Sequence, residues 1–162
     1  MAKKVEKTNV MRVFDQKKIA YNEYTYDPEK AISGTEVAAA LNQDVCQVFK
    51  TLVTIGASKK NYVFMVPVAE ELDLKKAAKS VKEKNIEMIK QADLLPLTGY
   101  VHGGCSPVGM KKVFPTVIHQ TASSFETIIF SGGKRGYQVE CTLDDLKKIV
   151  NVTEADIIVD KS

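Results

Sequence analysis

The sequence lacks the long apolar runs of a membrane protein. No stretch of the 162-residue sequence approaches the roughly 20 consecutive apolar residues that a membrane-spanning helix needs. The N-terminus, Met1-Ala2-Lys3-Lys4, has no apolar run after its lysines and is not a secretory signal. Charge is also nearly balanced, since 23 basic and 20 acidic residues give a net charge of +3. These absences exclude a strongly cationic coat protein and predict a cytoplasmic protein without a membrane partner.

Cysteine and histidine are scarce as well. The three cysteines, Cys46, Cys105 and Cys141, are widely spaced and form no CxxC or CxxH motif. An odd, scattered set argues against a disulfide framework and against a zinc knuckle. Two histidines, His102 and His119, are too few for a histidine-rich metal site. We therefore expect no metal and no cofactor, and we expect the cysteines to be small, partly buried hydrophobic residues.

The composition is that of a globular domain. Apolar residues make up 44% of the chain and charged residues 27%. The length suits one ordinary domain, and no linker, internal repeat or low-complexity segment interrupts it. We therefore expect a single domain over residues 1–162.

Five segments are predicted to be helical, most of them after a capping serine, threonine or aspartate. They span residues 8–18, 35–41, 73–81, 91–95 and 143–150. In the third, Asp73 is the expected cap, and the side chains expected to point inward are Leu74, Ala77, Ala78 and Val81. The fourth is predicted to be a helical turn that stops near Pro96.

Seven short strands are predicted between these helices. They span residues 20–26, 47–55, 62–68, 86–89, 116–119, 127–130 and 137–141. The second and third are expected to pair antiparallel, and residues 131–136 are expected to form a hairpin turn. Short strands interrupted by short helices predict an α+β fold with a curved mixed sheet.

Lys50 lies inside the most apolar of these strands. Side chains alternate along a strand, so Lys50 shares a face with Val48 and Leu52, while Thr51 faces the opposite side. Burying an ammonium is unfavourable and lowers its pKa. Lys50 therefore either opens into a cleft, where it can bind an anion or polarise a carbonyl, or lies near a strand end and reaches water. Thr51 is an ordinary strand residue unless the strand twists or bulges there.

A second candidate is the glycine-rich loop at residues 103–109, Gly-Gly-Cys-Ser-Pro-Val-Gly. Adjacent glycines let the backbone approach a ligand and direct N–H groups at it. Such donors can stabilise an oxyanion or hold a phosphate. The loop is neither a Walker A motif nor GxGxxG. Cys105 inside it is a poor candidate nucleophile, because only His102 lies near it in the sequence.

Two cationic segments are candidate phosphate contacts. Lys134 and Arg135 lie between glycines on the predicted hairpin turn, and Lys75 and Lys79 lie on one helical face together with Lys82. Either group could meet the phosphates of a nucleic acid. Either could equally be a solvated surface.

Four segments together resemble the YbaK/EbsC family of aminoacyl-tRNA deacylases. They are VFKTLV (48–53), LDLKKAAK (72–79), TGYVHGGCSPVG (98–109) and SGGKRG (131–136). They occur in the family's order and spacing, and the resemblance extends from about Thr8 to Asp160. It implies a fold like that of the prolyl-tRNA synthetase editing domain, with a curved mixed sheet or partly closed barrel flanked by short helices.

The resemblance also implies site residues. Lys50 matches the family's essential lysine and Gly103 the first glycine of its loop pair, so both are expected to be catalytic. Ser33 stands where an aromatic residue is often found, and Gln138 where some members have an acidic one. The expected substrate-binding residues are Tyr26, Ser33, Thr51, Gly104, Ser131 and Gln138. The candidate tRNA-phosphate contacts remain Lys75, Lys79, Lys134 and Arg135.

The implied reaction is hydrolysis of the ester of Cys-tRNA(Pro), in trans to prolyl-tRNA synthetase. Cysteine and proline are similar in size, so a synthetase pocket rejects cysteine poorly and a second site must remove it. The sequence offers no plausible Ser–His–Asp set. The resemblance implies that the substrate thiol attacks its own ester carbonyl, with direct attack by an ordered water as the rival chemistry.

Two other functions stay open. One is deacylation of another mischarged tRNA such as Ala-tRNA(Pro), because Ser33 and Gln138 depart from the family pattern. The other is a non-catalytic module that binds tRNA or a synthetase, which Lys50 disfavours, since a pure binder needs no lysine within an apolar strand. The small net charge indicates weak intrinsic affinity for tRNA, so we expect prolyl-tRNA synthetase as a partner.

Overall fold

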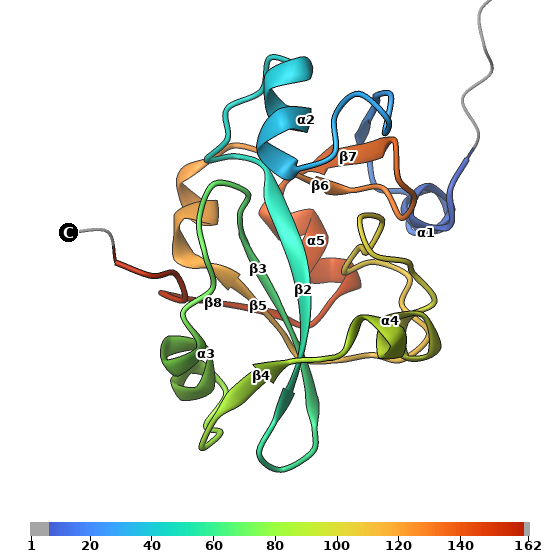
Figure 1. The fold of residues 1–162 in the computed structure, drawn as a ribbon. Coiled ribbons are helices and arrows are strands. Elements are labelled where there is room, and N and C mark those ends of the chain that lie inside the picture. The colour runs from blue at the N-terminus through green and yellow to red at the C-terminus, as the bar shows by residue number, and fades with distance from the viewer. Residues whose placement is uncertain (1–6, 161–162) are drawn as a thin grey trace, which may run out of the picture.

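The computed structural model describes residues 7–160, whose strands form two sheets (Figure 1). The strands are β1 (Asn22–Thr25), β2 (Phe49–Gly56), β3 (Asn61–Pro67), β4 (Ile86–Met88), β5 (Thr116–His119), β6 (Ile128–Ser131), β7 (Tyr137–Cys141) and β8 (Val152–Ala155). One sheet has the order β1–β7–β6 and is antiparallel. The other has the order β4–β2–β3–β5–β8 and is mixed, because β5 pairs parallel with both β3 and β8. The predicted α+β fold with a mixed sheet is therefore confirmed, without a closed barrel.

The helices of the described residues are short, and four of the five α-helices begin at side-chain caps, α4 being the exception. They are α1 (Asn9–Gln16), α2 (Gly34–Ala40), α3 (Leu74–Ser80), α4 (Gln91–Thr98) and α5 (Leu143–Ile149), with a 3₁₀ turn at Gln120–Ser124. The oxygens of Thr8, Ser33, Asp73 and Thr142 each accept a hydrogen bond from a backbone N–H in the first turn of the helix that follows. Such caps satisfy N–H groups that have no partner within the helix. Over the described residues, no helix has the length and apolar character needed to span a bilayer.

Two details of the predicted helices are wrong. Helix α4 runs through Pro96 and ends at Gly99, where φ is +84°. Proline at the sixth position removes only one helical hydrogen bond, and the N–H of Gly99 still donates to the Leu95 carbonyl at 2.9 Å. Leu74 is 42% exposed rather than buried. Helix α3 packs on the sheet from its second turn onward, through Ala77 and Ala78.

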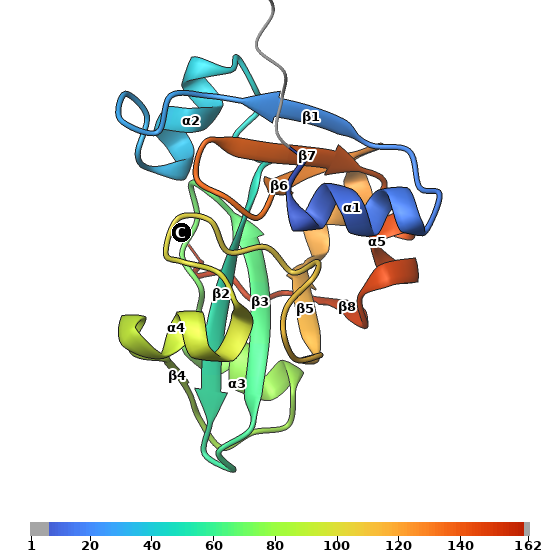
Figure 2. The same cartoon turned by 90° about the vertical axis from the view of Figure 1, so that its right-hand side faces the viewer.

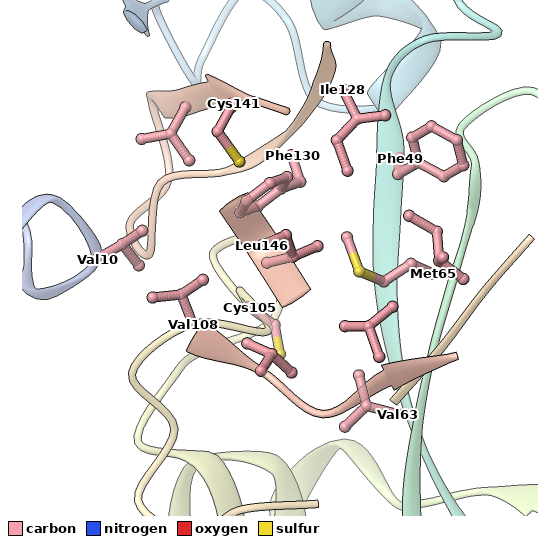
Figure 3. Close-up of a cluster of buried hydrophobic side chains, with 14 of the residues drawn as sticks. Val10, Phe49, Val63, Met65, Cys105, Val108, Ile128, Phe130, Cys141 and Leu146 are labelled. Atoms are coloured by element: carbon pink, nitrogen blue, oxygen red, sulfur yellow. The ribbon is translucent and has the colours of Figure 1, made fainter. Parts of the chain in front are cut away.

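The core lies on both faces of the five-stranded sheet. Along β3, Val63 and Met65 point into a large cluster that also contains Phe130 and Leu146 (Figure 3). The alternate residues Tyr62, Phe64 and Val66 pack against α3 on the other face. Packing on both faces explains why every residue of β3 after Asn61 is buried, as in an apolar strand covered on both sides.

His119, at the end of β5, ties the C-terminal segment to the core. It is 4% exposed, and its Nδ1 accepts a hydrogen bond from the Ile157 N–H at 3.3 Å. Burial lowers the pKa of His119, and the Asp156 carboxylate 3.9 Å away opposes this only in part. The imidazole of the folded protein is therefore neutral at neutral pH.

We expect the free energy of unfolding to decrease as the pH falls below about 6.5, the ordinary histidine pKa. In that range the unfolded chain binds a proton that folded His119 does not, so stability rises with pH. Urea unfolding at pH 7, 6 and 5 should show this loss in the wild type and a smaller loss in His119→Asn, whose amide oxygen still accepts from Ile157. Equal losses in the two proteins would contradict the assignment.

Candidate active site

A cavity of about 450 Å³ lies along one edge of β2. Its walls come from parts of the chain that are far apart in sequence: β2, the segment before α2 with the start of that helix, the region from β4 through α4, the glycine loop, and the β6–β7 hairpin. The lining residues are Tyr26, Ile32, Ser33, Gly34, Val37, Val48, Phe49, Lys50, Thr51, Leu52, Val53, Val68, Met88, Ile89, Gln91, Leu94, His102, Gly103, Cys105, Phe130, Ser131, Tyr137 and Gln138.

The cavity exists because the sheet is incomplete beside β2. Strand β4 pairs with β2 only over Thr54–Gly56, and at the other end a single bridge joins Val48 to Ile129 of the second sheet. Within the described residues no strand pairs with the stretch between them on that side. The carbonyl of Val48 accepts from Val68, and the N–H of Gly56 donates to Lys60. Backbone groups alternate in direction along a strand, so the N–H and C=O of Thr51 point to the open edge.

Lys50 and Thr51 line the same cavity although they lie on opposite faces of β2. Strand β2 pairs continuously with β3 and has no bulge at Thr51, and both residues line the cavity at the strand's edge. Lys50 is half-buried, two residues into the strand. The Thr51 hydroxyl oxygen is buried and has no hydrogen-bond partner within the described structure. Buried polar atoms are normally paired, so an unpaired hydroxyl oxygen on a residue of the cavity wall is exceptional.

The glycine loop packs against the hairpin turn. Gly103 has φ +88°, a conformation that favours glycine, and lines the cavity. Gly104 is buried and is absent from the cavity lining. A Cβ at Gly104 would lie 3.1 Å from the backbone nitrogen of Arg135 and 3.2 Å from the Cα of Lys134. The two glycines therefore differ: Gly103 faces the cavity, and Gly104 lets the two loops touch.

The hairpin brings three further predicted residues to the cavity. The N–H of Tyr26 donates to the Gly136 carbonyl at 2.9 Å, which places Tyr26 against the turn. Ser131 lies opposite Gln138 in the β6–β7 register, and its Oγ accepts from the Gly133 N–H at 3.1 Å. Gln138 is 5% exposed, and its Oε1 accepts from Gln43 Nε2 at 2.7 Å.

Ser33 lines the cavity, but its side chain caps the N-terminus of α2. Its hydroxyl accepts from the Glu36 N–H, and the Glu36 carboxylate accepts from the Ser33 N–H, which is a complete capping box. The hydroxyl is thus held at the helix N-terminus. Ile32 beside it is 73% exposed, and Met88 across the cavity is 48% exposed. These two apolar side chains were not predicted, and only the folded arrangement places them at one cavity.

The candidate phosphate contacts fall into two separate groups. Lys134 and Arg135 are exposed on the hairpin turn, next to the glycine loop. Lys75 and Lys79 are exposed on α3, no residue of which lines the cavity. Helix α3 lies near β4, far from the β6–β7 hairpin (Figures 1 and 2).

Cys105 is a core residue rather than an activated nucleophile. Its sulfur lies among the side chains of the large cluster (Figure 3), and burial raises its pKa to about 12. A thiol with that pKa is protonated at neutral pH. Among residues 7–160, no group of three or more histidine, cysteine, aspartate or glutamate side chains is arranged to hold a metal ion.

Comparisons with known proteins point to one family. The model of the aminoacyl-tRNA editing domain matches residues 28–149. A protein of Enterococcus faecalis, named "Putative Cys-tRNA(Pro)/Cys-tRNA(Cys) deacylase EbsC", is 43% identical over 160 residues, covering 97% of this chain and 98% of the relative.

Two solved structures share the fold. One is described as "a putative trans-editing enzyme for prolyl tRNA synthetase" and has a TM-score of 0.80 at 22% identity, covering 94% of this chain and 98% of the other. The second, hypothetical protein APE2540, has a TM-score of 0.84 at 18% identity, covering 94% of this chain and all of the other. Together with the matched domain, the near full-length relative shows that this chain belongs to the aminoacyl-tRNA editing domain family.

Proposed function

We propose that this chain, as one domain over residues 1–162, is a cytoplasmic trans-editing enzyme that deacylates Cys-tRNA(Pro). The observation that carries the proposal is the position of Lys50, half-buried on an apolar strand and lining a cavity together with Gly103. The name of the Enterococcus relative, which covers two cysteinyl-tRNAs, supports cysteine as the acyl group.

The cavity suits the aminoacyl end of a tRNA. Its volume of about 450 Å³ lies within the range of small-molecule sites and could hold an aminoacyl group with part of the terminal adenosine. Tyr26, Ser131 and Gln138 form the wall that positions this group, and Lys134 and Arg135 lie next to the loop at its border. The exposed lysines on α3 lie apart from the hairpin and do not line the cavity, so we assign the phosphate contacts to the hairpin turn.

Lys50 and Gly103 would stabilise the developing oxyanion. The ammonium group of Lys50 provides charge and a hydrogen bond at the ester carbonyl, and the backbone N–H of Gly103 provides a further donor. The substrate's α-ammonium needs acceptors instead, and no aspartate or glutamate is among the described residues that line the cavity. The Thr51 carbonyl at the open edge of β2 supplies a neutral acceptor for it.

The substrate supplies the nucleophile in this scheme. The cysteinyl sulfur attacks its own ester carbonyl, the C–O bond to the ribose breaks, and the thiol proton ends on the released ribose oxygen. Water then opens the resulting thiolactone to give free cysteine. Cys105, the thiol of the cavity lining, is protonated and packed in the core, so it is not activated for this step.

The test is deacylation of Cys-tRNA(Pro) and Ala-tRNA(Pro), each with and without prolyl-tRNA synthetase. We expect loss of cysteine alone, since alanine has no thiol, and a stronger preference for tRNA(Pro) when the synthetase is present. Efficient hydrolysis of the alanyl ester would contradict the thiol step and favour an alanyl-tRNA deacylase. No activity on either ester would favour a binding module, and unchanged tRNA selectivity would contradict the partnership.

A further inference from the structure

We infer that Gln43 is a positioning residue that fixes the amide of Gln138 in the cavity wall. The inference rests on the proposed function and deepens it. Gln138 lies on β7, is 5% exposed and lines the cavity, whereas Gln43 lies outside it, in the connection between α2 and β2. Gln43 Nε2 donates to Gln138 Oε1 at 2.7 Å.

The backbone of Gln43 is held rigidly by the end of α2. Asn42 has φ +54°, and its N–H donates to the Ala39 carbonyl at 3.2 Å. The N–H of Gln43 donates to the Ala38 carbonyl at 2.8 Å. These two bonds form a Schellman motif, which gives the chain one defined exit from the helix. The Gln43 side chain therefore extends to β7 from a Cα atom whose position is fixed.

The pair is unfavourable as a purely structural contact. Gln43 Oε1 is buried and has no hydrogen-bond partner within the described structure. An unpaired buried acceptor has lost its hydrogen bonds to water without replacement, which offsets the gain from the bond that Nε2 makes. A methionine of similar length would avoid this cost, so the pair does more than hold α2 to β7.

The pair also has a preferred direction. In the observed arrangement one buried oxygen lacks a partner, whereas exchanging the two amides would leave a buried NH₂ group without an acceptor. Orphaned buried N–H groups are rarer in proteins than orphaned oxygens. With its Oε1 taken by Gln43, Gln138 is left with its Nε2 donor for a ligand in the cavity.

This orientation selects which substrate group binds the wall. A donor at Gln138 suits an oxygen or sulfur of the aminoacyl end and disfavours the α-ammonium, which is itself a donor. The ammonium then lies toward Thr51 rather than against the Gln138 amide. Gln43 thereby contributes to specificity without touching the substrate.

A double-mutant cycle tests the inference. The proteins are wild type, Gln43→Met, Gln138→Met and the double variant, with Gln47→Met as the matched control. Gln47 is a half-buried glutamine of the same connection that donates to the Thr127 carbonyl at 2.9 Å and does not line the cavity. The measurements are kcat and KM for Cys-tRNA(Pro), the unfolding midpoint, and calorimetric binding of the non-hydrolysable 3′-cysteinylamino-3′-deoxyadenosine.

We expect Gln43→Met to lower kcat/KM and analogue affinity about tenfold, the value of one oriented hydrogen bond, without lowering the unfolding midpoint. The same change should have no further effect in the Gln138→Met background. Gln47→Met should lower the midpoint and leave kcat/KM unchanged.

Three results would overturn the inference: unchanged kcat/KM and affinity in Gln43→Met, an equal loss in the Gln138→Met background, or no analogue binding by the wild type. A wild type that binds the analogue with the expected coupling but turns over no ester would overturn the deacylase assignment alone.

Discussion

Replacing Lys50 with methionine is expected to reduce kcat/KM for Cys-tRNA(Pro) by about 10²–10³-fold, the effect of removing one oxyanion-stabilising group. Methionine keeps the length and the apolar stem of the side chain. The change therefore removes the charge at the cavity with little effect on the packing of β2. Single-turnover deacylation separates this effect on the chemical step from an effect on product release.

A lysine outside the cavity provides the control for this substitution. Lys84 is exposed in the connection between α3 and β4 and is absent from the cavity lining. Lys84→Met should retain wild-type kcat/KM at the same salt concentration. If Lys50→Met kept more than about a third of the wild-type rate, Lys50 would not be the group that stabilises the oxyanion.

Replacing Gly104 with valine is expected to lower the free energy of unfolding by about 1–3 kcal/mol and to impair deacylation. The new side chain would meet the backbone of Lys134 and Arg135, which cannot move aside as a flexible side chain can. The glycine loop and the hairpin turn would separate, and Gly103 and Ser131 would lose their relative positions. Urea unfolding and kcat/KM measured on the same preparation check both effects.

The neighbouring glycine gives a contrast. A Cβ at Gly103 would meet only the Arg135 side chain, at 3.4 Å, so Gly103→Ala carries mainly the backbone cost of its positive φ, about 1–2 kcal/mol. Wild-type stability in Gly104→Val would show that the two loops are not packed as described. It would also favour the sequence-based expectation that Gly104 binds the substrate.

Local features of the fold were predictable from the sequence because their causes are local. Ser33, Asp73 and Thr142 cap the helices that follow them, and each cap depends on residues within one turn. Strand β8 was missed for the opposite reason. Its sequence, Val-Thr-Glu-Ala, has one buried residue, Val152, and the strand forms by pairing in parallel with β5. A strand that forms through backbone pairing needs no alternation of apolar and polar residues, so its sequence contains no pattern to recognise.

The candidate site, too, was predictable only in part. The roles of Lys50 and Gly103 came from the family resemblance, and the cavity brings both together. That Thr51 shares the cavity depends on how far β4 extends along β2, which is a long-range property. Nothing in the sequence marked Gln43 as a functional residue, because a glutamine after a helix is common and only the fold places it against β7.

The open stretch of β2 has a consequence for how this site should be studied. An exposed strand edge normally invites another chain to add a strand. Here β4 and the Val48–Ile129 bridge confine the opening to a few residues, too short for a stable intermolecular pairing. What remains is a pair of main-chain groups at Thr51, a carbonyl and an N–H, that every amino acid except proline would present. Side-chain scanning will therefore pass over these groups, whereas replacing the amide between Lys50 and Thr51 with an ester, by chemical synthesis, removes the N–H and leaves the Thr51 carbonyl in place.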